Sequence, residues 1–161
     1  MIYKGEINTA TGKNSILNGA DADYSGYVFD GIVFDNCILN NSIFKDCSIK
    51  VATFTNSYFI GCNFDTADLE GSNFTGSNFE NSLLANANLK DTNLASCNLI
   101  NCNFTSAILD TTDLTNANLT GSVGLDVDPN NKSLKVGEGA IIRWIDGLLW
   151  TYETDAWVVE N

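Results

Sequence analysis

The side chains best suited to chemistry are five cysteines and a scattered set of carboxylates. A thiolate is a nucleophile and a zinc ligand, and paired carboxylates can transfer protons. The 161-residue chain contains no histidine, so no serine or cysteine has the usual general base beside it. The G-x-S-x-G, S-x-x-K and phosphate-loop motifs are absent as well. We therefore expect a protein that is not an enzyme, with no catalytic residue, metal site or cofactor.

The cysteines all occupy the same position of a short repeat. Large apolar residues, called centres below, recur every five residues from Tyr24 to Leu119, twenty in succession, and include all nine phenylalanines. The residue two before a centre is small in eighteen of the twenty units. All five cysteines fall there: Cys37, Cys47, Cys62, Cys97 and Cys102. The pattern predicts that they are core thiols.

A period of five matches neither an α-helix, with 3.6 residues per turn, nor a strand, with two. A chain that turns a corner every five residues can still point every centre to the same side. The residue two after each centre is mostly Gly or Asn, which tolerate the positive φ of a tight turn. The spacing therefore predicts stacked coils around one continuous core.

These units resemble the A-(D/N)-L-x-x consensus of the pentapeptide-repeat family. Clear examples are Ala67-Asp-Leu-Glu-Gly, Ser72-Asn-Phe-Thr-Gly, Ala87-Asn-Leu-Lys-Asp and Ala117-Asn-Leu-Thr-Gly. The resemblance implies an all-β fold, a right-handed quadrilateral β-helix solenoid with four units per coil and about five coils. Residues twenty apart would then stack, and Cys62 and Cys102, two coils apart, would be separated by roughly 10 Å, too far for a disulfide.

The two ends depart from the repeat, so we expect an N-terminal cap at 1–21, the β-helix at 22–121 and a C-terminal segment at 122–161. Ser15-Ile-Leu-Asn-Gly resembles one further unit, out of register with the rest. Tyr27 and Ile32 place bulk where later coils have small residues, which indicates a plugged N-terminal end. Aliphatic residues also precede the first centres, and residues 1–20 are expected to cover part of them: Val28, Val33, Ile38 and Ile43.

The C-terminal segment begins with a loop over 122–139 and contains all three tryptophans. Asp146-Gly147 between apolar runs favours a β-hairpin, although the apolar spacing also fits a helix. About 40 residues cannot bury such side chains alone. We expect Trp144, Trp150 and Trp157 either to cap the open end beyond Leu119 or to dock on a side of the β-helix. If the segment docks on a second copy of the chain instead, the contact would make a homodimer.

The net charge of −12 argues against direct binding to nucleic acid or to an anionic membrane. The sequence shows no signal peptide and no apolar run of the roughly 20 residues needed to span a membrane, so a cytoplasmic location is expected. One predicted side is the most highly charged, and another is nearly uncharged and shows aliphatic residues, which makes it a candidate interface. The acidic side has Asp30, Asp68, Glu70, Asp91 and Asp110, and the candidate interface has Ile38, Tyr58, Ile60 and Ile100.

Two functional hypotheses follow. The first is a non-enzymatic interaction or scaffold module for an unknown protein partner. The alternative rests on the family resemblance, because members of the quinolone-resistance type mimic DNA and bind DNA gyrase. Residues 22–121 hold eleven acids and three lysines, a net of −8. Duplex DNA of the same length, roughly 24 Å, would carry about 14 charges, which weakens the alternative.

Overall fold

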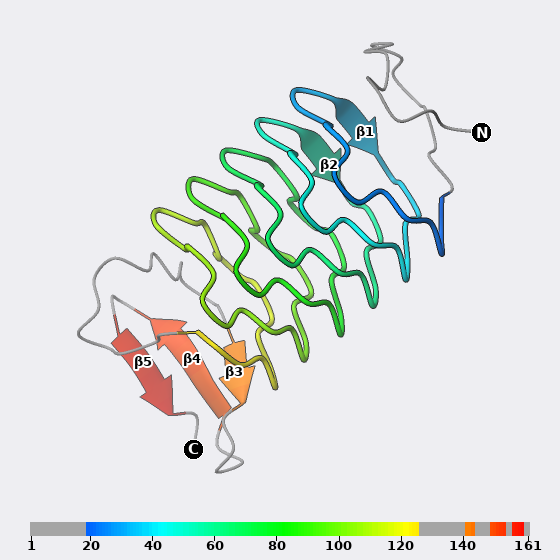
Figure 1. The fold of residues 1–161 in the computed structure, drawn as a ribbon. Coiled ribbons are helices and arrows are strands. Elements are labelled where there is room, and N and C mark those ends of the chain that lie inside the picture. Colours follow the sequence, from blue (N-terminus) through cyan, green and yellow to red (C-terminus); the bar gives the residue numbers. More distant parts are fainter. Residues whose placement is uncertain (1–18, 126–140, 144–148, 154–155, 160–161) are drawn as a thin grey trace.

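The fold is a stack of turns followed by a small sheet, and a computed structural model describes residues 19–125, 141–143, 149–153 and 156–159 (Figure 1). Every strand or helix assigned in these ranges is a β-strand. The strands are β1 (Val33–Asp35), β2 (Thr53–Thr55), β3 (Ile141–Arg143), β4 (Leu149–Glu153) and β5 (Ala156–Val159).

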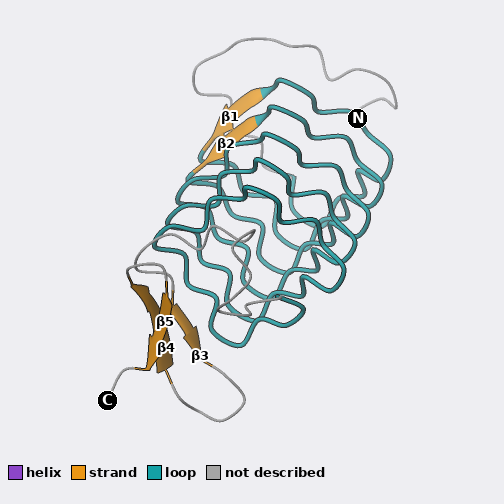
Figure 2. Cartoon of the chain, turned by 90° about the vertical axis from the view of Figure 1, so that its left-hand side faces the viewer, coloured by secondary structure: helices purple, strands orange, loops and turns teal. Residues whose placement is uncertain are grey.

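Parallel pairing joins residues that are twenty apart, as the repeat predicts. The series of bridges runs from Asp23↔Ile43 to Asn103↔Val123, and β1 pairs with β2 in the same register. Backbone hydrogen bonds connect each turn to the next at similar lengths throughout; Phe59 N donates to Asn78 O at 2.7 Å. Figure 2 shows the successive turns lying one against another. The pairing holds each turn in register with the next, so the outward side chains of successive turns are regularly spaced.

Each corner is a tight turn with a left-handed residue. All twenty positions two after a centre have positive φ, six of them Gly, seven Asn and two Asp. The carbonyl of the centre accepts a hydrogen bond three residues on, as in Ala67 N to Phe64 O at 3.0 Å. A turn with positive φ at its second central residue accounts for the choice of Gly and Asn. Val51 nevertheless adopts φ 52° at one corner, so the repeat overrides residue preference there.

The centres form the core. Eighteen of the twenty are buried, and only Phe34 and Leu109, near the two ends, are partly exposed. Rings twenty residues apart lie face to face, with centroids 4.7 Å apart for Phe44 and Phe64. Serines in the small position are satisfied by the backbone: Ser77 Oγ donates to Phe54 O at 2.7 Å and accepts from Ser57 N at 3.0 Å. Polar groups therefore enter this core without an unpaired donor or acceptor.

The C-terminal sheet is antiparallel, in the order β3-β4-β5. β3 pairs with β4 through Ile142↔Trp150, which agrees with the hairpin interpretation and not with a helix. The predicted Asp146-Gly147 turn lies outside the described residues. Figures 1 and 2 both place this sheet near the last turns of the stack.

Candidate contact surfaces

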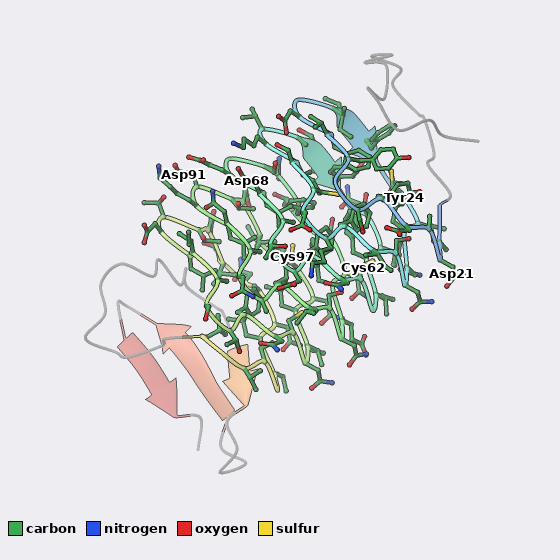
Figure 3. The ribbon with its side chains drawn as sticks, viewed as in Figure 1. Asp21, Tyr24, Cys62, Asp68, Asp91 and Cys97 are labelled. Atoms are coloured by element: carbon green, nitrogen blue, oxygen red, sulfur yellow. The ribbon has the colours of Figure 1, made fainter. Side chains whose placement is uncertain are left out.

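The thiols belong to the core and act as hydrogen-bond donors. All five cysteines are reduced and buried, as predicted. Cys62 Sγ donates to Leu39 O at 3.0 Å and Cys97 Sγ to Phe74 O at 3.0 Å, the bonds that serines make at the same position (Figure 3). Burial raises the pKa of Cys47 to about 11 and that of Cys62, Cys97 and Cys102 to about 12. These thiols stay protonated at neutral pH, which makes them poor nucleophiles and poor metal ligands.

Within the described residues, no group of three or more Cys, Asp or Glu side chains is placed to hold a metal ion. The same part of the chain contains no helix long and apolar enough to cross a membrane.

The residue before each centre points outward and stacks on its equivalents at twenty-residue intervals. Ile38 and Tyr58 are direct neighbours in one such column and are 40% and 48% exposed. Ile60, partly buried, follows Phe59 on the same segment, and its backbone N donates to Asn40 Oδ1 at 3.0 Å. We call Ile38, Tyr58 and Ile60 the apolar triad.

Ile100 lies on the same side but does not join the triad. It occupies the position of Ile60 two turns further on, at a separation of roughly 10 Å. Glu80 occupies that position in the intervening turn. The predicted interface is therefore divided, with three residues together and Ile100 apart.

The first turn carries a second set of exposed apolar side chains. Val28 and Val33 are 55% and 60% exposed, more than any member of the triad, and Ile43 is exposed as well. Together with Ile38 they stand five residues apart, one in each column. We call these four residues the collar. Their aliphatic character is visible in the sequence, but their degree of exposure is not.

The predicted acidic side combines carboxylates with lysines. Lys50 Nζ lies 2.7 Å from Asp68 Oδ2, and Lys90 Nζ lies 3.3 Å from Glu70 Oε1. The hydrogen bond and charge of Asp68 raise the pKa of Lys50, so this ammonium group remains protonated at neutral pH. Asp30 Oδ1 accepts from Ser48 Oγ at 2.7 Å. Charges of both signs thus alternate along this column.

The remaining predicted residues of this side are exposed. The Thr111 hydroxyl donates to Asp91 Oδ1, and Asp110 is the adjoining exposed carboxylate. Of the predicted tryptophans, Trp150 lies in β4 and Trp157 lies in β5. Trp144 and the side chains of all three lie outside the described residues, and so does any contact that they make.

Two models of a known protein family match the residues of the stack. A profile of the pentapeptide repeat region covers residues 20–94, and a profile of eight copies of the pentapeptide repeat covers 82–121. The chain therefore belongs to the pentapeptide-repeat family. No curated protein matches it significantly.

Among solved structures, the chain resembles the pentapeptide-repeat protein Rfr23 from the cyanobacterium Cyanothece 51142, with a TM-score of 0.54 and 19% identity, covering 63% of this chain and 80% of Rfr23. HetL of Nostoc, a protein involved in heterocyst differentiation regulation, gives 0.42 at 18% identity, covering 81% and 56%. QnrB1, a plasmid-mediated fluoroquinolone resistance protein, gives 0.33 at 13% identity, covering 79% and 90%. At 19% identity, the match to Rfr23 shows similarity of fold alone.

Proposed function

We propose that the chain is a non-enzymatic protein-binding scaffold, built as a right-handed four-sided β-helix of about five coils. The apolar triad on a hydrogen-bonded stack, with Ile38 and Tyr58 exposed and Ile60 partly buried beside them, is the observation that carries the proposal. Neighbouring exposed apolar residues are a feature of contact surfaces. The inward, protonated thiols and the absence of histidine from the sequence support a non-enzymatic role.

The dimensions of the stack indicate what kind of partner fits. One side, about 24 Å long and about 10 Å wide, offers roughly 240 Å², against about 800 Å² per partner in a standard interface. A globular partner would have to extend over neighbouring sides. A short apolar segment of a partner protein fits the triad without that extension, and we propose this as the ligand.

The chain itself supplies substitutions that test the triad. Asn occupies the position of Ile38 and Tyr58 in each of the three later turns, so Ile38→Asn and Tyr58→Asn introduce residues that the fold already accepts there. Ile108→Asn is the matched control, because Ile108 is 48% exposed in another column and the preceding turn has Asn88.

Quantitative affinity capture from the source cell should enrich a protein that the double variant loses and the control retains. Isothermal titration with that purified partner should then show at least about tenfold weaker binding for the double variant, about 1.4 kcal/mol. Equal enrichment and equal affinity for all three proteins would rule out the triad as the binding site.

Mimicry of DNA at gyrase is the second candidate, favoured by the concentration of carboxylates in one column. The interleaved lysines oppose it, because Lys50 and Lys90 neutralise Asp68 and Glu70 in the places where a DNA backbone is uniformly negative. A supercoiling assay with purified gyrase, with and without a quinolone, tests the idea. Mimicry predicts stronger inhibition by the Lys50→Gln/Lys90→Gln variant, and no effect of either protein at micromolar concentration would exclude it.

A further inference from the structure

The N-terminal rim of the stack has unpaired backbone groups along Val28–Asp35. One turn further in, Ser48 N donates to Tyr27 O at 3.0 Å, and Ser48 O accepts from Phe29 N at 2.7 Å. In the first turn, the N–H groups of Val28 and Val33 have no hydrogen-bond partner among the described residues. The carbonyls of Val28, Asp30, Val33 and Asp35 also lack a partner there. This rim is an open strand edge, the kind of edge to which a further strand can pair.

Elsewhere on the rim, the preceding turn has already begun. Gly19 N donates to Ile38 O at 3.1 Å and Asp21 N to Asn40 O at 2.9 Å, the bonds that Leu39 and Asn41 make one turn later. Asp21 also has the positive φ of a corner, 59°. Gly19 and Asp21 therefore lie on the rim in the register of the repeat.

Apolar exposure adds to the cost of leaving this edge uncovered. Val28 and Val33 flank it with more than half of their surface in water, and the centre Phe34 is only partly buried. Covering the two valines would remove this apolar surface from water, which is favourable. The edge therefore favours an occupant with both backbone groups and aliphatic side chains.

The segment before Gly19 meets these needs. We infer that residues 1–18 pair with the Val28–Asp35 edge as a closing strand and cover Val28 and Val33. Eighteen residues are close to the twenty of one turn, and they include Ile2, Ile7, Ile16 and Leu17.

Charge supports the same occupant. The segment contains Lys4 and Lys13 and one acid, in a chain with only eight basic residues. The rim has Asp30 and Asp35, and hydrogen bonds from Thr55 and Asn56 lower the pKa of Asp35, so it stays ionised at neutral pH. The ion pairs of the described lysines go to carboxylates beyond the first turn.

The segment ends the stack and does not lengthen it. Lys4, Thr9 and Asn14 stand twenty residues before the centres Tyr24, Phe29 and Phe34, so a full further turn would place polar side chains in the core. A second copy fits the edge less well. If a second copy continued the stack at twenty residues per turn, residue 108 of one copy would lie next to residue 28 of the other. Val123 of the first copy and Asp23 of the second would then have to occupy the same place in their shared column.

Amide exchange in the full chain, followed residue by residue by NMR, tests the inference. Val28 and Val33 should be protected by at least about 100-fold, as hydrogen-bonded amides are. Ile16→Asp/Leu17→Asp should abolish this protection and leave Ser48 and Thr53, the equivalent amides one turn in, unchanged. Asn14→Asp/Asn18→Asp adds the same charge without removing apolar surface and should retain it.

Exchange of Val28 and Val33 at the rate of an unstructured peptide in the wild-type chain would overturn the inference. Protection that survives Ile16→Asp/Leu17→Asp, or that disappears on dilution, would do so too, because it would assign the edge to another segment or to a second copy. The wild-type measurement decides the matter even if the aspartate variant fails to fold.

Discussion

Val51 is the corner residue least suited to its backbone, and replacing it should stabilise the protein. Its φ of 52° lies in the left-handed region, where a residue with a Cβ loses about 1–2 kcal/mol and a β-branched residue is an outlier. Its side chain is 71% exposed, so little packing is lost when it is removed. Val51→Asn keeps the hydrogen bond from Val51 N to Glu70 O at 3.0 Å, because that bond belongs to the backbone. We expect a gain of about 1 kcal/mol, since Asn tolerates this conformation better.

Thermal and urea unfolding followed by circular dichroism measure the effect. A gain of 1 kcal/mol corresponds to a rise in Tm of about 2–4 °C for a chain of this size. Ile108→Asn is the matched control, because Ile108 is also an exposed β-branched residue but is not among the residues with positive φ. Asn116→Val makes the reverse change at a corner with φ 58° and should cost a similar amount.

The reasoning would be refuted if Val51→Asn and Ile108→Asn shifted the free energy of unfolding equally. It would also fail if Asn116→Val were neutral. Either result would mean that the corners relax around a β-branched residue, so that their φ values carry no strain.

Four further predictions concern the core and the ends. Phe74→Asp should prevent folding, because it buries an unpaired charge between stacked rings; a soluble variant with unchanged far-UV dichroism would contradict the inward position. The five thiols should react with a thiol reagent at pH 8 only after denaturation, since their burial excludes the reagent and a pKa near 12 where burial is deepest leaves almost no thiolate; rapid native labelling would contradict this. Deleting 140–161 should cause aggregation or loss of dimers, and a truncated protein with unchanged Tm and oligomeric state would exclude a capping role. Gly19→Ala should destabilise the first turn because its Cβ would lie 1.9 Å from the Tyr24 hydroxyl oxygen, and Tyr24→Phe should partly rescue it in a double-mutant cycle.

The sequence predicts the stack well because each unit repeats the same local solution and contacts only its neighbours. Prediction weakens toward the two ends: Phe34 and Leu109 fit the pattern as well as any centre, but both are only partly buried. Arithmetic on twenty-residue columns places Ile60 and Ile100 on one side with Glu80 between them, so the division of the predicted interface can be derived from the sequence. The tryptophan segment has no period at all, so neither its docking nor its register against the stack could be predicted.

The same one-dimensional order explains where specificity can reside in this protein. The middle turns are nearly interchangeable, since Asn occupies their outward positions again and again and accepts the backbone N–H two residues on, as Asn73 Oδ1 does from Thr75 N at 3.0 Å. An outward Asn side chain that is hydrogen-bonded within its own turn has fewer free donors and acceptors for a partner. The collar and the triad depart from that rule, and both belong to the first two turns, where aliphatic and aromatic side chains replace Asn. We therefore expect a partner that distinguishes this chain from other stacks of the same fold to contact the N-terminal turns. Substitutions there should change binding, while equivalent changes in the middle should change only stability.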